Sequence, residues 1–317
     1  MNSTIARLIV NRLGIGVLTL FIVSIVVFTI TSLLPGDAAQ EMLGQSATPE
    51  TLAALRAEFG LDQPVYIRYI DWLGGLLSGD PGTSLVNGMP IMELIGGRLP
   101  ASLKLAAAAT LVSVPVALFI GIFSAMYRGS AFDRYSNMFA VFSVSVPEFL
   151  IATIAVLIFA VNLGWLSALS HISEDASFSE MVRAYAMPVL TLCCVLVAQM
   201  ARMTRAAVID QLSSPYVEMA MLKGASSIRI VLLHALPNAI GPIANAVALS
   251  LSYLLGGVII VESIFNYPGI ATLMLNSVTT RDMPLVQACA MLFCFGYLIL
   301  VLIADICEIV SNPRLRK

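Results

Sequence analysis

The side chains that could do chemistry in this chain gather in one polar stretch between two long apolar runs. Residues 213–242 carry Glu218, Lys223, Arg229 and His234. Carboxylate, ammonium, guanidinium and imidazole groups can form charge-assisted hydrogen bonds with a partner, whereas the flanking apolar side chains can only pack. This stretch is therefore the first candidate functional region.

The same stretch is predicted to fold as two short helices joined at a glycine. Ser214 is a favourable N-cap, and Pro215 in the first helical turn loses no backbone hydrogen bond. Gly224 stands where a left-handed residue commonly ends a helix, and Pro237 is predicted to end or kink the second helix. The simpler interpretation is an interfacial loop with ordinary helix caps and no further function.

One carboxylate is predicted to lie deep inside an apolar segment. Glu148 follows Pro147 near the middle of the apolar residues 136–161. In one continuous helix it would lie about 18 Å from either end, at 1.5 Å per residue, and an ionisable group at that depth faces a cavity, is paired or is protonated. We hypothesise that both residues line a translocation path where Glu148 meets a cationic or amine-bearing substrate. A paired or protonated structural carboxyl is an equal alternative.

The sequence motifs of catalysis are missing. There is no G-x-x-x-x-G-K-[ST] loop to cradle phosphates, no H-E-x-x-H and no G-x-S-x-G. The five cysteines lie in or beside apolar runs without metal-ligand spacing: Cys193, Cys194, Cys289, Cys294 and Cys307. We therefore predict that the chain is not an enzyme and that it holds no metal or other cofactor of its own.

The composition is that of a membrane protein. Of the 317 residues 59% are hydrophobic and 11% are charged, whereas soluble domains average roughly 25% charged. The net charge of −2 gives no basic field for binding nucleic acid. These values predict an all-α polytopic membrane protein with one membrane domain.

About six transmembrane helices are expected, because roughly 20 apolar residues cross a hydrocarbon core about 30 Å thick. The predicted spans are 13–34, 101–126, 136–161, 184–201, 238–261 and 284–310. Residues 1–34 form a tail and the first helix, and residues 35–100 form an external segment. Residues 101–310 form the core domain with a loop at 202–237, and residues 311–317 form a second tail.

The external segment is predicted to carry small helices. Thr48 and Pro49 are a helix start, and Gly60 is a stop. Residues 64–77 form a second, amphipathic stretch. Its apolar side is predicted to hold Ile67, Ile70, Trp72, Leu73, Leu76 and Leu77.

Orientation follows from the distribution of lysine and arginine, which favour the cytoplasmic side. The short loop between Arg128 and Arg134 and the basic C-terminal tail lie on one predicted side. Both termini and the 213–237 hairpin share that side. We therefore expect them to face the cytoplasm.

The hairpin resembles the EAA loop of ABC-transporter permeases, through the pattern E-x-A-x-x-x-G from Glu218 to Gly224. It is most similar to the dipeptide/oligopeptide/nickel importer branch. In that family the loop docks on a cytoplasmic ATPase. The resemblance implies an ATPase-coupling loop that contains Tyr216, Glu218, Ala220, Lys223, Gly224, Arg229, His234 and Pro237.

Two further segments resemble the same branch. The first is the external sequence FGLDQPVYIRYIDWLGGLLSGDPGTSL. The second begins at Glu262 and implies an external gate and a face for the solute-binding protein. Its residues are Glu262, Phe265, Pro268, Gly269, Arg281 and Asp282, and Glu262 is hypothesised to form a polar clasp with the last two.

The resemblance implies a type I importer permease fold and the role of a dipeptide permease B-type subunit in the bacterial inner membrane. The implied partners are a second homologous permease, two cytoplasmic ATP-binding subunits that hold ATP and magnesium, a periplasmic solute-binding protein and a peptide substrate. A nickel or glutathione importer of the same branch is the alternative. An ion-coupled secondary transporter is less favoured, because Glu148 alone is a thin basis for an ion site.

Overall fold

The computed structural model describes residues 2–34, 36–170 and 177–311, and these residues are nearly all helical. Five segments are long and apolar enough to cross a membrane: Ile9–Leu43, Ile91–Met126, Phe178–Leu212, Ser227–Ile264 and Met283–Cys307. A bent pair of helices, Ala131–Ser145 and Glu148–Asn162, gives a sixth candidate span. The predicted all-α polytopic class is confirmed.

The chain divides into two compact units. The first unit holds Met1–Leu13, Lys104–Phe265 and Tyr297–Lys317, and the second holds Gly14–Leu103 and Asn266–Gly296. Three long helices contribute residues to both units: α1 (Asn2–Leu33), α5 (Ile91–Met126) and α13 (Met283–Ser311). Each unit is described separately below.

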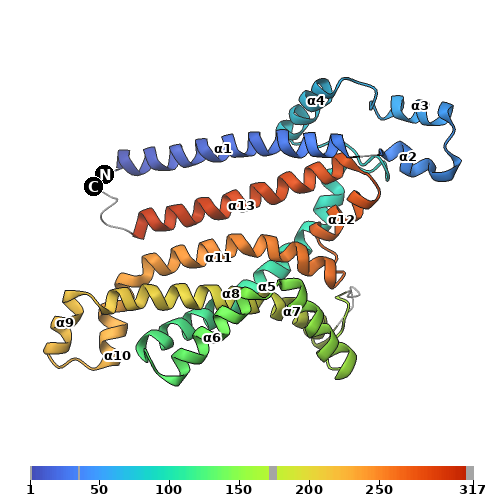
Figure 1. The fold of residues 1–317 in the computed structure, drawn as a ribbon. Helices are drawn as coiled ribbons and strands as arrows, with labels where there is room; N and C mark the ends of the chain where they lie inside the picture. Colours follow the sequence, from blue (N-terminus) through green and yellow to red (C-terminus); the bar gives the residue numbers. More distant parts are fainter. Residues whose placement is uncertain (1, 35, 171–176, 312–317) are drawn as a thin grey trace. The chain divides into compact units, whose positions relative to one another are not determined.

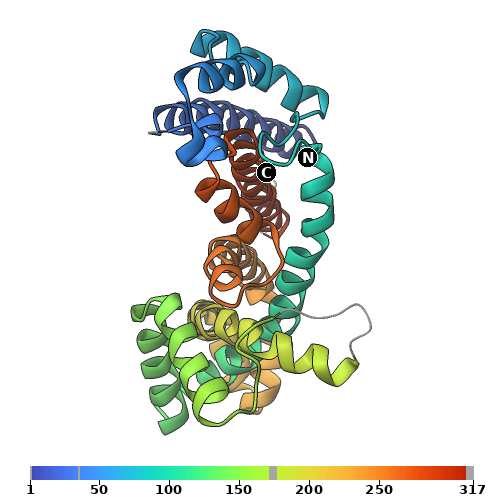
Figure 2. The same cartoon turned by 90° about the vertical axis from the view of Figure 1, so that its right-hand side faces the viewer.

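The first unit is built on two long helices, α8 (Phe178–Leu212) and α11 (Leu236–Ile264). They lie side by side in both views (Figures 1 and 2). Helix α6 (Ala131–Ser145) packs on α8. One core cluster of this unit consists of small and branched side chains: Ala125, Ala207, Val208, Ala239 and Ile243.

Close helix packing in this unit depends on a glycine of α5. A Cβ atom added at Gly121 would lie 2.7 Å from the carbonyl oxygen of Ala201 and 2.7 Å from the Cβ of Thr204. Because no real Cβ atom approaches other heavy atoms so closely, only glycine fits this contact between α5 and α8.

The span predicted near residues 136–161 is present as a bent pair of helices and not as one straight helix. The chain bends by 102° between α6 and the helix that begins at Glu148. Helix α7 (Glu148–Ala155) continues as a π-helical segment over Val156–Asn162. Proline disfavours helical geometry in the residue before it, and Val146 is extended, with φ −96° and ψ 128°. The depth of about 18 Å predicted for Glu148 assumed one straight helix, so it is withdrawn.

The external segment of the second unit contains the predicted small helices, α2 (Ala38–Leu43), α3 (Pro49–Glu58) and α4 (Val65–Ser78). The side chain of Thr48 caps α3, and Gly60 follows its end with φ +64°. Both signals were read correctly from the sequence. Figure 1 shows these helices near the Leu33 end of α1.

The predicted apolar face of α4 is only partly right. Tyr69 and Trp72 pack on Phe28 of α1, with ring centroids 5.3 and 5.6 Å apart. Ile70 and Leu77, predicted to lie inward, are 63% and 80% exposed. Tyr69 takes the inward position because its hydroxyl also reaches Ser24 Oγ, 2.9 Å away. The apolar pattern alone therefore predicted the wrong rotation of α4 about its axis.

The remaining core of the second unit joins three helices. Ile91 and Ile95 of α5 pack with Ile270 of α12 (Ile270–Thr279) and with Leu285 and Cys289 of α13. These side chains bury the first turns of α5 and α13 against α12.

We expect Gly121→Ala to destabilise the protein by about 1–3 kcal/mol, because the new methyl group overlaps the backbone of α8. The measurement is the apparent melting temperature of the purified protein in mild detergent. Gly97→Ala in the same helix is the matched control, since nothing lies within 4 Å of a Cβ at that position. Equal melting temperatures for the two variants would contradict the proposed packing constraint.

Candidate functional site

The predicted hairpin is present as α9 (Pro215–Leu222) and α10 (Ser227–Ile230), joined at Gly224 with φ +81°. The amide of Ala225 donates to the carbonyl of Ala220 (3.2 Å), and the amide of Gly224 donates to that of Met221 (2.9 Å). This pair of bonds is a Schellman motif, which requires a left-handed residue at its centre. Pro215 lies in the first turn of α9 as predicted.

The hairpin has a small core of its own. Val217 and Ala220 of α9 are buried against Ile230 of α10, and Leu212 and Ala225 pack against this cluster. Ala220 is therefore a packing residue between the two short helices. A larger residue at that position would separate them.

The hairpin exposes charged and apolar side chains together. Glu218, Lys223 and Arg229 are exposed, and His234 is half-buried. The hydroxyl of Tyr216 donates a hydrogen bond to Gln211 Oε1 over 2.9 Å, because an amide oxygen can only accept. Large apolar side chains of the hairpin are also exposed: Met219, Met221, Leu222 and Ile228. A surface of this mixed kind suits contact with another protein.

Of the two outcomes predicted for Pro237, an end of the second helix is not found, and a kink stays a prediction. Residues Val231–Ala235 form a π-helical turn, and α11 begins at Leu236, so the helix runs from Ser227 to Ile264. The amide of Leu236 donates to the carbonyl of Val231, five residues back. The wider turn lets the helix continue into a proline, which has no amide hydrogen to donate.

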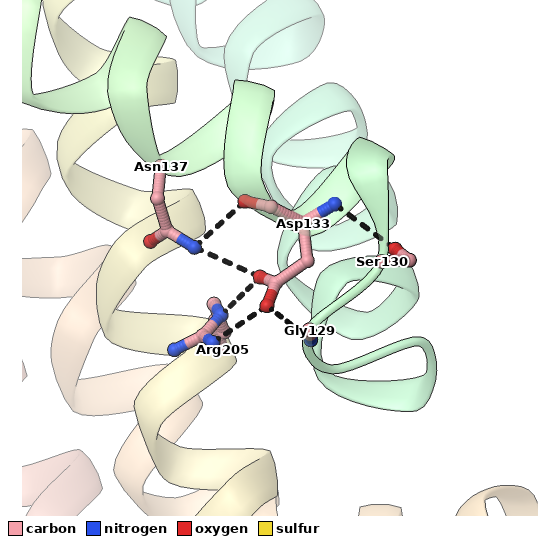
Figure 3. Close-up of polar contacts among 5 residues, drawn as sticks. All are labelled: Gly129, Ser130, Asp133, Asn137 and Arg205. Atoms are coloured by element: carbon pink, nitrogen blue, oxygen red, sulfur yellow. Dashed lines mark hydrogen bonds and ion pairs between the residues drawn. The ribbon is translucent and has the colours of Figure 1, made fainter.

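Sequence reasoning missed an ion pair between α6 and α8 (Figure 3). Arg205 Nε lies 2.6 Å from Asp133 Oδ1, and its Nη2 lies 2.9 Å from Oδ2. The Gly129 amide and the Asn137 side chain donate to the same carboxylate over 2.9 and 2.8 Å. The Asp133 side chain is only 6% exposed, so these donors compensate for its lost hydration.

The local sequence shows only half of this ion pair. Ser130 and Asp133 have the spacing of a helix start, and the Asp133 amide donates to Ser130 Oγ over 3.2 Å. Nothing in that spacing identifies Arg205 as the partner. The pair joins the first turn of α6 to α8, and α8 leads at Leu212 into the hairpin.

The two residues predicted for a translocation path lie at the bend. Pro147 is the N-cap of α7, and half-buried Glu148 is its first residue. The Glu148 carboxylate oxygens lie 2.8 and 3.1 Å from the position that a Cβ of Gly257 would take. The glycine therefore leaves space on α11 for the carboxylate, and the role of both residues in transport stays a prediction.

The predicted gate residues fall in both units. Glu262 and Phe265 belong to the first unit and are fully buried, and the Ser170 amide donates to the Phe265 carbonyl over 3.0 Å. Pro268 and Gly269 belong to the second unit and precede α12.

Asp282 is bound by the external segment. It accepts a short hydrogen bond from the Ser84 hydroxyl and a second, of 3.2 Å, from the Leu85 amide. Arg281 beside it has a positive φ of 59°. These bonds join the two segments that each resembled the importer branch. The partners that they show for Asp282 are Ser84 and Leu85, and the hypothesised clasp with Glu262 stays a prediction. The assignment of these residues to a gate stays a prediction.

Tyr267 is a further buried polar residue of the second unit. Sequence reasoning missed Tyr267, which is fully buried and whose hydroxyl donates to the Ala101 carbonyl over 2.8 Å. Within residues 2–34, 36–170 and 177–311, no cluster of three or more histidine, cysteine or acidic residues could hold a metal ion.

We expect Asp133→Ala to lower the free energy of unfolding by about 3 kcal/mol, because it leaves the Arg205 guanidinium partly buried without its partner. The double variant Asp133→Arg with Arg205→Asp should not recover stability, since Gly129 and Asn137 would then donate toward a guanidinium. Thermal unfolding followed by circular dichroism in detergent measures both effects.

Arg202→Gln is the matched control for this prediction. Arg202 is an exposed arginine of the same helix, and it has no ion pair among the described residues. Full recovery of stability by the charge swap would show that only the charges matter and would contradict the role given to the two additional donors.

Comparison with known proteins identifies the family. Residues 117–317 match the family described as binding-protein-dependent transport system inner membrane component, and residues 5–106 match its N-terminal part. The glutathione transport system permease protein GsiC of Salmonella typhimurium is 36% identical over 298 residues, which are 94% of this chain and 95% of that protein. GsiC of Escherichia coli is 35% identical over 316 residues, which are 100% of this chain and 99% of that protein. The chain therefore belongs to the inner-membrane permeases of binding-protein-dependent ABC importers.

Proposed function

We propose that this permease moves short peptides inward as one of two membrane subunits, driven by ATPase subunits that dock on the α9–α10 hairpin. The observation that carries the proposal is the form of that hairpin. A Schellman-capped pair of short helices with its own core presents Met219 and Leu222, which are 55% and 77% exposed, beside charged residues. An apolar helix face with a charged rim can fit a groove on a partner.

The orientation is part of the proposal. The lysine and arginine distribution puts both termini and the hairpin in the cytoplasm. Two ATP-binding subunits would bind there, and ATP and magnesium would be held by them and not by this chain. A second homologous permease would complete the membrane part, and a periplasmic solute-binding protein would deliver the substrate from the other side.

The relatives support a peptide substrate. Glutathione, named for the relatives, is a tripeptide, so a short peptide is the substrate class that fits best. Glu148 and Pro147 at the bend of the α6–α7 pair are proposed to line the path, where the carboxylate would meet the amino group of the peptide. Glu262, Phe265, Pro268, Gly269, Arg281 and Asp282 are proposed to form the outer gate and the face for the binding protein.

The proposal is tested by affinity purification of the tagged chain from native membranes in mild detergent, followed by mass spectrometry and reconstitution. We expect ATP-binding subunits and a second permease to copurify. The complex in liposomes should take up peptide only with ATP inside and binding protein outside. Uptake by the chain alone that ignores ATP and collapses with an uncoupler would instead show an ion-coupled transporter.

A variant of the hairpin glycine tests the coupling role. Gly224→Ala should destabilise the folded hairpin by about 1 kcal/mol, because a Cβ atom disfavours the left-handed backbone conformation. No steric clash adds to this cost, since nothing lies within 4 Å of the new Cβ position. We expect normal membrane insertion but reduced stimulation of ATP hydrolysis by the loaded binding protein.

Two matched variants separate the causes. Gly224→Asn should retain most of the coupling, since asparagine tolerates positive φ. Gly256→Ala, at an open position of α11, should behave like the wild type. Full coupling in Gly224→Ala would contradict the role given to the hairpin.

A further inference from the structure

The second unit holds a cavity, and Arg281 is the one residue lining it that also belongs to the proposed outer gate. Its volume is about 510 Å³, and it is lined by the end of α1, by α2 to α4 and by the first residues of α13. Ligand pockets in proteins commonly measure about 300–1,000 Å³. In the proposed orientation the cavity lies on the external side.

Three arginines line the cavity, and only one of them has an ion-pair partner among the described residues. Arg56 Nε lies 2.7 Å from Asp37 Oδ2, and the other oxygen of Asp37 caps α2 through the Gln40 amide. The carboxylate of Asp37 is thus already occupied by the protein. Arg68 lies over the Phe28 ring, 6.0 Å from its centroid, and Arg281 has no ion pair in the described part of the chain.

The backbone holds Arg281 at the cavity in an unusual conformation. Its φ of +59° is uncommon for a residue with a side chain and is retained only where neighbours impose it. The end of α12 imposes it here, because the Arg281 amide donates to the Val278 carbonyl over 3.3 Å and the Asp282 amide to the Ser277 carbonyl over 2.9 Å, the two bonds of a Schellman cap. Ser84 and Leu85 bind the carboxylate of the adjacent Asp282. Leu85 itself lines the cavity. The contacts of Ser84 and Leu85 with Asp282 therefore hold this part of the cavity wall next to the guanidinium of Arg281.

The other lining groups are polar and aromatic. Ser32 Oγ and Trp72 Nε1 belong to lining residues and are buried without a hydrogen-bond partner in the part of the chain that the structure describes. Gln287 is 4% exposed and donates to Thr31 Oγ1 over 2.6 Å. Asp71 adds one carboxylate to the lining. Guanidinium groups and one carboxylate in the same space complement a ligand that carries both charges.

We propose that this cavity binds a short zwitterionic peptide through its terminal carboxylate, held by Arg281 and Arg68. The site rests on the proposed function, since it gives the peptide a second place on the permease, apart from Glu148 and Pro147. A planar guanidinium binds a carboxylate through two parallel hydrogen bonds. Asp71 then faces the ammonium end, and the aromatic side chains cover the body of the peptide.

Trp72 provides a direct measurement, because the chain has only two tryptophans and the other is Trp165. The full-length Trp165→Phe chain in lipid nanodiscs is titrated with trialanine and, separately, with trialanine amide. We expect a saturable change in Trp72 fluorescence with trialanine and binding weaker by at least about tenfold with the amide. This comparison needs no change in the cavity itself.

Arg281→Gln should weaken trialanine binding by about tenfold or more, with unchanged helicity by circular dichroism. Arg98→Gln, an exposed arginine of α5 outside the cavity, should bind like the parent. No saturable response up to about 10 mM, equal binding of the amide, or unchanged binding by Arg281→Gln would each overturn the proposal.

Uptake distinguishes this inference from the proposed function. ATP-driven uptake of trialanine by the reconstituted complex without a Trp72 response overturns the cavity site and leaves the function intact. A Trp72 response without any uptake supports the site and counts against the proposed function.

Discussion

The constraint on which this structure depends is the absence of water from the hydrocarbon core. Backbone amides and carbonyls there must bond within their own helix, so every candidate span of the described chain is helical. No hydrophobic driving force brings helices together in such a medium, and close van der Waals packing of two helices needs small residues at the contact. Gly121 against Ala201 and Thr204, and Gly257 against Glu148, are two such contacts in this chain.

The described helices depart from regular α-helical geometry in two π-helical segments and one bend. Hydrogen bonds continue through the π-helical segments, and the bend lies at a proline. A π-helical turn over Val231–Ala235 precedes Pro237, and a second such segment, Val156–Asn162, follows α7. The bend at Val146 and Pro147 leaves the Val146 amide bonded to the Phe142 carbonyl over 3.2 Å.

Charged residues link elements that are distant in sequence. Asp133 meets Arg205, Asp305 of α13 lies 3.3 Å from Arg12 of α1, and Asp282 is bound by Ser84. The Asp133 pair is the most buried of the ion pairs described and collects the most donors. Because α8 continues from Arg205 toward the hairpin, this pair connects the first turn of α6 with the surface proposed for ATPase docking. Movement of that surface would therefore reach α6 through a salt bridge as well as through packing.

The sequence by itself determined the features that depend on local backbone chemistry. The positive φ of Gly224, the Thr48 cap and the first-turn position of Pro215 follow from residue type alone, and apolar length was enough to identify the spans. The motif segments were also sufficient to recognise the family that the comparisons establish.

Only the tertiary structure decided the features that join residues far apart in the chain. The partner of Asp133 lies 72 residues away, and that of Asp282 lies 198 residues away. The rotation of α4, the helix that continues into Pro237 and the cavity around Arg281 depend likewise on neighbours from other elements. A residue's own type and spacing state which bonds it can make, but the packing of the other helices decides which of those bonds form.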